Sequence, residues 1–416
     1  MKYIKAKLLI DGTGNKPLEN PVIVVDGKRI VEVGTVDSIC VPEGAVIIDR
    51  KNEVLLPGLI DSHSHAGEDS KRAESVSEQH LKPDPLRILR GYVSLWNDLQ
   101  GGVTTVRLLG DGGGFIDKIL RDAIYAKEIV GPRLLVCCLP IRPSHGTAPE
   151  ISECQGADGV DEVRKRVRQA IYHGADVIKL FTSNISNGDT FLDYLKGDLT
   201  QIAAYTKPEM EVAVEEAHRA GKKVAAHCIG GEAIQWGIEA GIDSLEHVNL
   251  IEEEDIPYFL EHGTYISDPN LHLFFDPIKG FESPQNKSWV WEDLPEWWHE
   301  KVYRARENTK RVMGKALEAG VKFALATDLN HGGLWLEAKY FVEQIGATPM
   351  EAILACTSNG ADCCGILDIT GTVEVGKYAD IISLSANPLE KIDYLKDVTF
   401  VMKEGEVIRE ELCENI

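Results

Sequence analysis

Six side chains of types that bind metal ions or move protons stand at the ends of short apolar segments. Two of them are histidines two residues apart, and the other four follow separate segments. Side chains at positions i and i+2 of a strand point to the same side of a sheet, so the paired histidines would face one point. The six residues are His63, His65, Lys179, His227, His247 and Asp328.

Each of these residues alone has an ordinary structural explanation. A histidine at a strand end is commonly hydrogen-bonded within the fold, and an aspartate after a strand commonly caps a helix. Lys179 is harder to explain, because burying an unpaired ammonium group is costly. Four imidazoles, one amine and one carboxylate that meet at one place are explained most simply by bound metal ions.

Lys179 bears on the number of ions, because an ammonium group cannot ligate a cation. A desolvated lysine loses its proton more readily, and the neutral amine can add carbon dioxide to form a carbamate that bridges two cations. The sequence therefore predicts two divalent ions, with carbamylated Lys179 between them. Imidazole and carboxylate ligands favour Zn²⁺ and also suit Mn²⁺, Co²⁺ or Fe²⁺. One ion would take His63, His65 and Asp328, and the other His227 and His247.

The segments that must position these residues share one rhythm from about residue 55 to about residue 364: a short apolar strand, then a stretch of helical period. Eight strands alternating with helices over about 300 residues fit a (β/α)₈ TIM barrel, whose catalytic groups stand at the C-terminal ends of the strands. A doubly wound sheet is the alternative. The helical stretches include Gly159–His173, Lys207–Ala220 and Lys301–Ala319. The expected strands are Gly58–Asp61, Val103–Leu108, Arg133–Leu139, Asp176–Phe181, Lys223–Ala226, Ser244–Val248, Thr264–Ser267 and Val321–Ala326.

Both ends of the chain are rich in short β segments separated by turns. We therefore expect a small β-sandwich domain formed by residues 1–56 and 365–416, with residues 57–364 as the barrel. Its expected strands are Lys2–Ile10, Val22–Asp26, Arg29–Val33, Ala45–Asp49, Gly371–Val373, Asp380–Leu384, Val398–Lys403 and Val407–Arg409.

Composition narrows the classes of partner. Lysine and arginine number 44 and aspartate and glutamate 66, which gives a formal charge of −22 and argues against a nucleic-acid or anionic-membrane surface. No run approaches the ~20 apolar residues that span a bilayer. The N-terminal apolar stretch is too short for a signal peptide, and the nine cysteines show neither disulfide nor zinc spacing, so we expect a cytoplasmic protein.

The ordered set of candidate ligands strongly resembles the amidohydrolase superfamily over nearly the whole chain. The resemblance includes His63-x-His65, the four later ligands in order, and the closing segment 371–380, which is typical of the flanking β-sandwich. Within the superfamily the chain looks like the branch that contains imidazolonepropionase-like proteins, Xaa-Pro dipeptidases (prolidases), carboxypeptidases for C-terminal Arg or Lys, and ochratoxin-type amidases. Segments 157–164, 174–179, 205–209 and 357–361 carry this narrower match.

The resemblance implies hydrolysis of an amide or peptide C–N bond, in an Xaa-Pro or Xaa-Arg/Lys dipeptide or an N-acyl amino acid, by a hydroxide that bridges two metal ions. Asp328 would accept the proton of the water and pass it to the leaving nitrogen. His145 and Tyr205 would donate to the scissile carbonyl and to a substrate carboxylate. Relatives are often homo-oligomers, so we expect one here. His331 is as well explained by loop structure as by substrate contact.

Two segments depart from the family pattern. After Lys179 the family usually shows Ser-Gly-Gly, whereas this chain has Thr182-Ser183-Asn184 in a loop that borders the substrate. The segment 274–303 holds four tryptophans, which would pack a long excursion, form an oligomer contact, or wall the pocket for a bulky substrate.

Two other functions are compatible with the same residues. One is hydrolysis of a cyclic amide, a urea or a heterocyclic C–N bond, although Lys179 argues against deamination because superfamily deaminases commonly use one metal and lack this lysine. The other is a catalytically silent metal-binding protein, which the presence of all six candidate residues disfavours.

Overall fold

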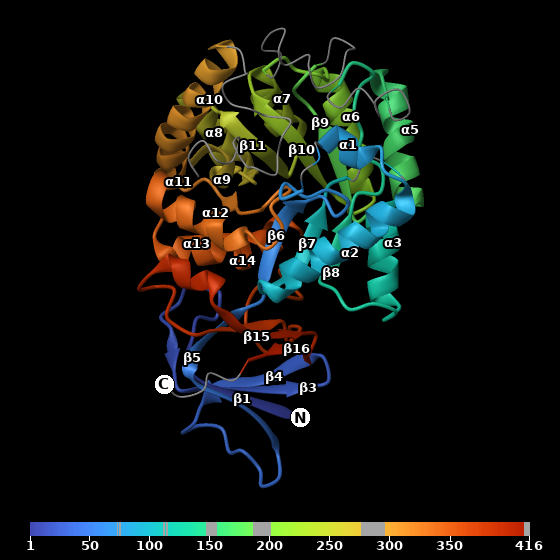
Figure 1. Ribbon diagram of the computed structural model, residues 1–416. Coiled ribbons are helices and arrows are strands. Elements are labelled where there is room, and N and C mark those ends of the chain that lie inside the picture. The colour runs from blue at the N-terminus through green and yellow to red at the C-terminus, as the bar shows by residue number, and fades with distance from the viewer. Residues whose placement is uncertain are drawn as a thin grey trace.

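The computed structural model describes residues 1–72, 74, 76–110, 113, 115–146, 156–185, 201–275 and 296–411. Figure 1 shows a larger α/β part above a smaller β part, and the N-terminus lies in the smaller part. Among the described residues, no helix is long and apolar enough to cross a membrane.

Eight parallel strands form the wall of the larger part. They pair in two sheets, β6-β7-β8 and β9-β10-β11-β12-β13. Parallel bridges from Ile141 to Leu180 and from Ser64 to Asp328 join the two sheets at both seams, so the strands close into a barrel. The expected (β/α)₈ barrel is confirmed. The strands are β6 Leu59–Ser64, β7 Val103–Leu108, β8 Arg133–Val136, β9 Val177–Phe181, β10 Lys223–Gly230, β11 Ser244–Leu250, β12 Tyr265–Ser267 and β13 Phe323–Ala324.

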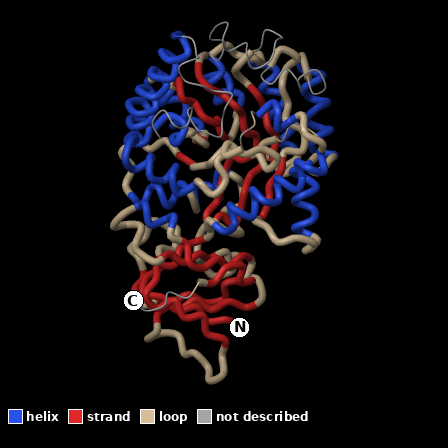
Figure 2. Tube along the Cα trace, viewed as in Figure 1, coloured by secondary structure: helices blue, strands red, loops and turns tan. Residues whose placement is uncertain are grey.

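Helices surround this barrel (Figures 1 and 2). Helix α6 shows how the sequence starts one: Thr206 and Glu209 form a capping box, and Pro208 stands in the first turn, where its missing N–H costs nothing. The expected stretch Lys301–Ala319 forms α10, the π-helical turn η4 Thr309–Met313 and α11. The helices are α1 Val76–His80, α2 Asp84–Gln100, α3 Ile116–Tyr125, α5 Gly159–Tyr172, α6 Lys207–Arg219, α7 Glu232–Ala240, α8 Ile256–His262, α9 Leu271–Phe275, α10 Glu296–Asn308, α11 Gly314–Ala319, α12 Leu334–Tyr340, α13 Pro349–Ala355 and α14 Ser358–Cys363.

The smaller part is one mixed sheet in the order β16-β15-β14-β5-β1-β3-β4, with β2 paired to β1. Strand β5 joins the two ends of the chain, because it pairs parallel with β1 and antiparallel with β14. One core cluster combines side chains of β1 and β3 with those of β14 and β15, so the two halves of the sheet pack on each other. This confirms a β domain built from both termini, while its exact boundaries stay a prediction. The strands are β1 Lys2–Leu9, β2 Leu18–Glu19, β3 Pro21–Asp26, β4 Arg29–Thr35, β5 Val46–Pro57, β14 Ile381–Leu384, β15 Val398–Lys403 and β16 Glu406–Glu410.

A single residue, Gly58, separates β5 from the first barrel strand, β6. A Cβ atom at this position would lie 2.1 Å from Oγ1 of Thr104, so only glycine fits. Its N–H donates to the carbonyl of Asp380 at 2.9 Å, which ties the junction to the C-terminal strands.

The strand expected at Gly371–Val373 is wrong, because the segment is irregular. Gly371 has a φ of +88°, and a Cβ there would lie 2.5 Å from that of Ala361. The N–H of Val373 donates to the carbonyl of Asp11. The segment is therefore a close-packed turn between the barrel and the β domain.

Candidate metal centre

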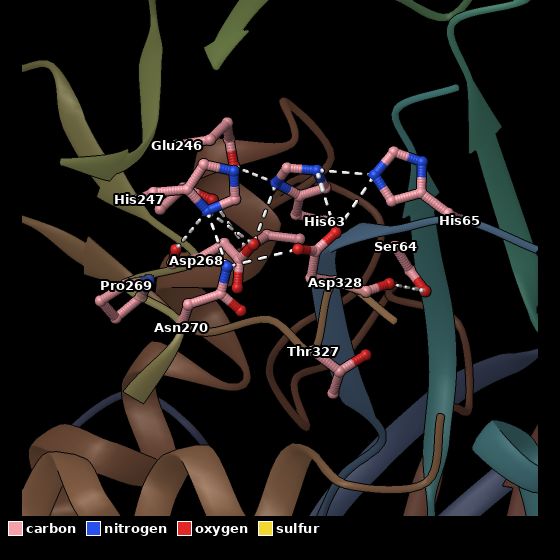
Figure 3. Close-up of polar contacts among 12 residues, drawn as sticks. His63, Ser64, His65, Glu246, His247, Asp268, Pro269, Asn270, Thr327 and Asp328 are labelled. Atoms are coloured by element: carbon pink, nitrogen blue, oxygen red, sulfur yellow. Dashed lines mark hydrogen bonds and ion pairs between the residues drawn. The ribbon is translucent and has the colours of Figure 1, made fainter. Parts of the chain in front are cut away.

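The histidine pair at the end of β6 converges on one point with the carboxylate of Asp328. The Nε2 atoms of His63 and His65 lie 3.2 Å apart. Oδ1 of Asp328 lies 3.2 Å from Nε2 of His65 and 3.9 Å from Nε2 of His63. Tetrahedral Zn²⁺ with metal–ligand bonds of about 2.0–2.1 Å separates its ligands by roughly 3.3 Å. These three atoms therefore have the spacing of ligands around one cation (Figure 3).

The hydrogen bonds of the two rings fix which nitrogen faces that point. Nδ1 of His65 lies 2.6 Å from the carbonyl oxygen of Gly110, which can only accept, so Nδ1 is the donor. Nδ1 of His63 faces Oε2 of Glu246 at 3.1 Å and donates in the same way. When both rings are neutral, their Nε2 lone pairs point at each other. A cation between them turns this repulsion into ligation.

Glu246 is itself held by a buried arginine from a neighbouring part of the barrel. Arg107 of β7 is fully buried, and its Nη2 donates to Oε1 of Glu246 at 3.0 Å. The arginine also donates to the carbonyl of Ser62 and to the hydroxyls of Ser244 and Ser267. Arg107 thus balances the charge of Glu246, which in turn orients His63.

The remaining candidate ligands lie on β9, β10 and β11. Phe181 pairs in register with His227 and Lys179 with Ala225, so Lys179 and His227 point to the same side of the sheet. The ring of His247 lies 4.9 Å from that of His227 and 5.1 Å from that of His63, centre to centre. The four imidazoles therefore form one continuous group at the C-terminal end of the barrel.

Lys179 is 1% exposed. Its ammonium group makes no hydrogen bond or ion pair among the described residues, and it lies 5.2 Å from the ring centre of Phe181. Burial lowers the pKa of Lys179 to about 8, although the charges of Glu246 and Asp328 oppose the shift. The amine is thus easier to deprotonate than an ordinary lysine.

Burial lowers the pKa of His63, His227 and His247, so these three rings are neutral at pH 7. Burial alone would raise the pKa of Asp328, but the hydrogen bond to His65 holds it well below its ordinary value, and the same hydrogen bond raises the pKa of His65. The carboxylate is therefore ionised. Neutral imidazoles and an ionised carboxylate are the protonation states that metal binding requires.

The backbone is strained at several of these residues. His247, Asp268, Asn270 and Asp328 have φ values of +76°, +47°, +53° and +54°, in the left-handed region that ordinary side chains disfavour. Each such residue costs on the order of 1–3 kcal/mol, and such strain clusters at active sites. The strain directs these side chains into the barrel mouth from the strand ends.

Comparison with known proteins identifies the family. Residues 54–408 match the profile described as "Amidohydrolase family". The chain belongs to the amidohydrolase family.

Three relatives show the range of that similarity. The amidohydrolase is 33% identical to the ochratoxinase of Aspergillus niger over 98% of this chain and 86% of that protein. The solved structure of the A. niger ochratoxinase superimposes with a TM-score of 0.83 at 30% identity, over 99% of this chain and 96% of the other. A solved Xaa-Pro dipeptidase with bound methionine gives a TM-score of 0.84 at 29% identity, over 98% and 99% of the chains. The imidazolonepropionase of Alkaliphilus metalliredigens is 22% identical over 94% of this chain and 90% of that protein.

The family and the candidate ligands together make the protein a metal-dependent amidohydrolase that hydrolyses carbon–nitrogen bonds. No ion is part of the structure, and the ligand types fit a divalent cation. The catalytic and metal-ligating roles of single residues stay predictions.

The amidohydrolase holds two further acidic residues at this site that the sequence did not suggest, Glu246 and Asp268. Oδ2 of Asp268 lies 3.2 Å from Nδ1 of both His63 and His247. The sequence holds one sign of each residue. Glu246 and Arg107 are opposite charges within barrel strands, which suggests a buried ion pair. Asp268 directly follows β12, a strand whose C-terminal end carries no predicted site residue.

The two residues expected to contact substrate are placed differently in the amidohydrolase. His145 is exposed in the loop after β8. Tyr205 is 2% exposed, and its hydroxyl donates to the carbonyl of Ala157 at 2.9 Å. A contact with substrate would require Tyr205 to exchange that hydrogen bond, so its role and that of His145 stay predictions.

The structure describes the Thr182-Ser183-Asn184 loop, which is one of the two departures from the family pattern, and only part of the aromatic segment 274–303, which is the other. Asn184 has a φ of +71°, and its amide nitrogen lies 3.0 Å from Nε2 of His227, so this loop reaches a candidate ligand. Of the aromatic segment, residues 276–295 lie outside the described residues. Phe274 packs with Leu250, Val302 and Ala305.

His331 is a buried structural residue in the amidohydrolase. Its Nδ1 donates to Oδ2 of Asp98 at 2.7 Å, and its Nε2 faces the carbonyls of Glu68 and His65 at 3.0 and 3.2 Å. Burial would lower the pKa of His331, but the pair with Asp98 outweighs it and raises the pKa to about 9. This charged histidine holds the loop that follows the metal-ligand pair.

We expect His331→Asn to lower the free energy of unfolding by about 3–5 kcal/mol at pH 6, because it leaves the buried carboxylate of Asp98 without its charged partner. The folded-state pKa lies above the ordinary 6.5, so the stabilisation is complete below about pH 6.5 and is lost as the pH rises through about 9. Urea unfolding at pH 6 and at pH 9.5 measures the difference, which should shrink at the higher pH.

His218→Asn is the matched control, because His218 pairs with Asp243 on the surface. It should change the free energy of unfolding by about 0–1 kcal/mol. An equal loss for His331→Asn at both pH values would contradict the charged pair.

Proposed function

We propose that the protein hydrolyses an amide C–N bond of a small molecule with two divalent cations at the barrel mouth, Zn²⁺ being the favoured metal. The observation that carries the proposal is the convergence of the Nε2 atoms of His63 and His65 with Asp328. These residues would hold one ion, and His227 and His247 the other. Partial exposure of His65, His227 and Asp328 leaves room for substrate on the solvent side.

Lys179 would join the two ions as a carbamate. Its neutral amine forms a bond to the carbon of carbon dioxide and releases one proton, which gives an anion with two ligating oxygens. The absence of any hydrogen bond or ion pair to this ammonium among the described residues, together with a pKa lowered by burial to about 8, supports the neutral amine.

Bound metal ions would supply an activated water at neutral pH and polarise the scissile carbonyl. The chain supplies the proton transfers. The ionised carboxylate of Asp328 takes one proton from the attacking water and delivers it to the leaving nitrogen, so the C–N bond breaks as an amine and a carboxylate form. Asn270 steadies that carboxylate, because its Nδ2 donates to Oδ2 of Asp328 at 3.3 Å. His145 and Tyr205 would donate to the carbonyl oxygen and to a substrate carboxylate.

The proposed substrate is a dipeptide, Xaa-Pro or Xaa-Arg/Lys, or an N-acyl amino acid. The similarity to an ochratoxinase over nearly the whole chain and to an Xaa-Pro dipeptidase structure supports this class. The similarity to imidazolonepropionases favours a second candidate, hydrolysis of a cyclic amide, a urea or a heterocyclic C–N bond. We also propose a homo-oligomer in the cytoplasm.

We expect about two equivalents of metal per chain after loading with Zn²⁺ or Mn²⁺, because six ligand side chains serve two ions. Chelation should abolish hydrolysis and reloading should restore it. Metal analysis combined with a panel of Xaa-Pro and Xaa-Arg dipeptides, N-acyl amino acids, ochratoxin-like amides and cyclic ureas tests both the centre and the substrate class.

The panel also separates the alternatives. Full activity with about one equivalent of metal would contradict the two-ion centre, and chelator-insensitive hydrolysis would contradict metal dependence. Turnover of cyclic substrates alone would replace the proposed substrate class with the second candidate.

A further inference from the structure

Helix α2 presents a line of apolar side chains to solvent. Leu86, Leu89 and Val93 are 39%, 65% and 56% exposed, and the partly buried Trp96 continues the line. Their spacing of three, four and three residues is the a/d pattern of a helix that pairs with another helix. Figure 1 shows α2 on the outside of the barrel. The structure therefore leaves uncovered a stripe that is suited to helix pairing.

The inner face of α2 carries polar groups that hold the helix in place. Ser94 and Asp98 are buried there, and Asp98 accepts a hydrogen bond from Nδ1 of His331 at 2.7 Å. Gly91 fixes the rotation of the helix, because a Cβ atom at this position would lie 3.0 Å from the carbonyl oxygen of Ala66. The helix therefore cannot turn to bury the stripe within its own subunit.

The stripe carries no charge, although a surface helix ordinarily turns charged or polar side chains to solvent. Helix α2 has four charged residues. Arg87 and Asp98 are buried, and Asp84 stands in the first turn, before the stripe begins. Arg90 lies to one side, where its Nη1 donates to Oε2 of Glu74 at 2.6 Å. The outer face of α2 is thus an apolar surface with its charges kept off it.

The charge of the whole chain bears on what can cover this stripe. The formal charge is −22, so two copies repel each other wherever their acidic surfaces meet. At an uncharged stripe they can touch without placing like charges opposite each other, which would cost affinity. A basic partner, by contrast, would be drawn to the acidic surface and would find no complementary charge here. The stripe fits a second copy of this chain.

The spacing of the stripe also matches itself in reverse. When two copies of α2 run antiparallel about a twofold axis, Leu86 meets the partner's Trp96 and Leu89 meets the partner's Val93. Each a position then faces a d position. Twofold dimers, in which the same patch of both copies forms the contact, are the commonest oligomers. One stripe is therefore sufficient for both sides of the contact.

The length of α2 sets the share of the contact that it supplies. The helix has 17 residues and is about 25 Å long and about 10 Å wide. Leu81, which precedes α2 and is 75% exposed, extends its apolar surface at one end. A standard interface takes about 800 Å² from each partner, so the stripe would form the apolar centre and neighbouring polar residues the rim.

We propose that α2 pairs antiparallel with α2 of a second copy about a twofold axis. The seam consists of Leu86, Leu89, Val93 and Trp96 of both copies. This pairing rests on the homo-oligomer of the proposed function and names its contact surface.

The test is sedimentation equilibrium of the purified protein. We expect the wild type to have a multiple of the 45.9 kDa chain mass. Leu89→Glu/Val93→Glu places acidic groups opposite each other in the seam and should halve that mass, since a twofold contact joins copies in pairs. Rising NaCl should tighten the wild-type association, because salt screens the repulsion between acidic copies.

Leu260→Glu/Val375→Glu is the matched control, because it adds the same two charges at side chains that are 46% and 62% exposed. It should leave the mass unchanged, and circular dichroism checks that each variant folds. Leu89→Glu/Val93→Lys tests the orientation, since antiparallel pairing brings each introduced carboxylate opposite an introduced ammonium group of the other copy. It should associate about 10-fold more tightly than Leu89→Glu/Val93→Glu.

Three results would overturn the proposal. A multimeric wild type whose mass Leu89→Glu/Val93→Glu does not change would exclude this surface and leave the homo-oligomer in place. Equal dissociation constants for the two seam variants would exclude antiparallel pairing. A monomeric wild type would exclude both the pairing and the homo-oligomer, and the stripe would then serve another partner. These measurements use no metal and no substrate, so they are independent of whether the protein hydrolyses an amide.

Discussion

Asp328→Asn should lower kcat by about 10²–10⁴-fold, the contribution of a positioned general acid–base group, while the protein keeps its metal ions. The variant preserves the shape of the side chain and one oxygen that can face the ion shared with His63 and His65. An amide oxygen cannot take a proton from water near pH 7, however, and cannot pass one to the leaving nitrogen. Steady-state kinetics with the substrate found in the panel, together with metal analysis of the same sample, measure both properties.

Asp362→Asn is a suitable control for this variant. Asp362 is another ionised carboxylate, but it accepts from the hydroxyl of Tyr265 and pairs with Lys322 outside the metal centre. It should leave kcat unchanged. A kcat near the wild-type value for Asp328→Asn would contradict the proton transfer, and loss of the metal with kcat would show that the carboxylate acts chiefly as a ligand.

Much of the architecture could be predicted because buried parallel strands have a simple signature. The barrel strands are short buried runs rich in apolar residues, and the sequence predicts Val103–Leu108 with the bounds that the structure has. The ligand positions followed from the same signature, since the C-terminal ends of the strands meet at one edge of a barrel. The spacing of His63 and His65 also predicted that their rings would lie together, and they do.

The partners of those ligands could not be predicted, because they depend on contacts between segments far apart in the chain. Arg107 and Glu246 are separated by 139 positions, and neither residue shows in its own segment that it pairs with the other. The position of the Asp268 side chain could not be predicted for another reason. Its left-handed φ turns the side chain toward the rings, and no periodic pattern encodes such a local backbone conformation.

The turn at Gly371–Val373 is a second feature that local sequence could not predict. Its composition resembles a strand, but the close approach of Gly371 to Ala361 and the hydrogen bond from Val373 to Asp11 decide its conformation. Both contacts are tertiary. Local propensity is a weak guide wherever such contacts dominate.

Lys179→Ala should cost the protein both its activity and at least one metal ion. A bridging ligand serves both cations, and the charge stabilisation that they provide is worth several kcal/mol, so kcat/KM should fall by about 10³-fold or more. Alanine leaves a void beside Phe181 that a small carboxylate can enter. Acetate or propionate has the two oxygens of the carbamate and should restore part of the metal content and activity, which kinetics and metal analysis at rising carboxylate concentration would show.

Lys403→Ala provides the matched control, because Lys403 is a largely buried lysine of β15 whose pKa burial also lowers. It should change neither metal content nor kcat/KM, and carboxylates should not affect it.

In the wild type, reconstitution of metal-free protein with ¹³C-bicarbonate should give a carbamate signal in ¹³C NMR. Formation of the carbamate should slow as the pH falls below about 8, since protonation of Lys179 removes the nucleophile. Lys179→Ala should lack the signal. A Lys179→Ala variant that binds two ions and is fully active would show that the lysine serves the barrel wall and not the metals.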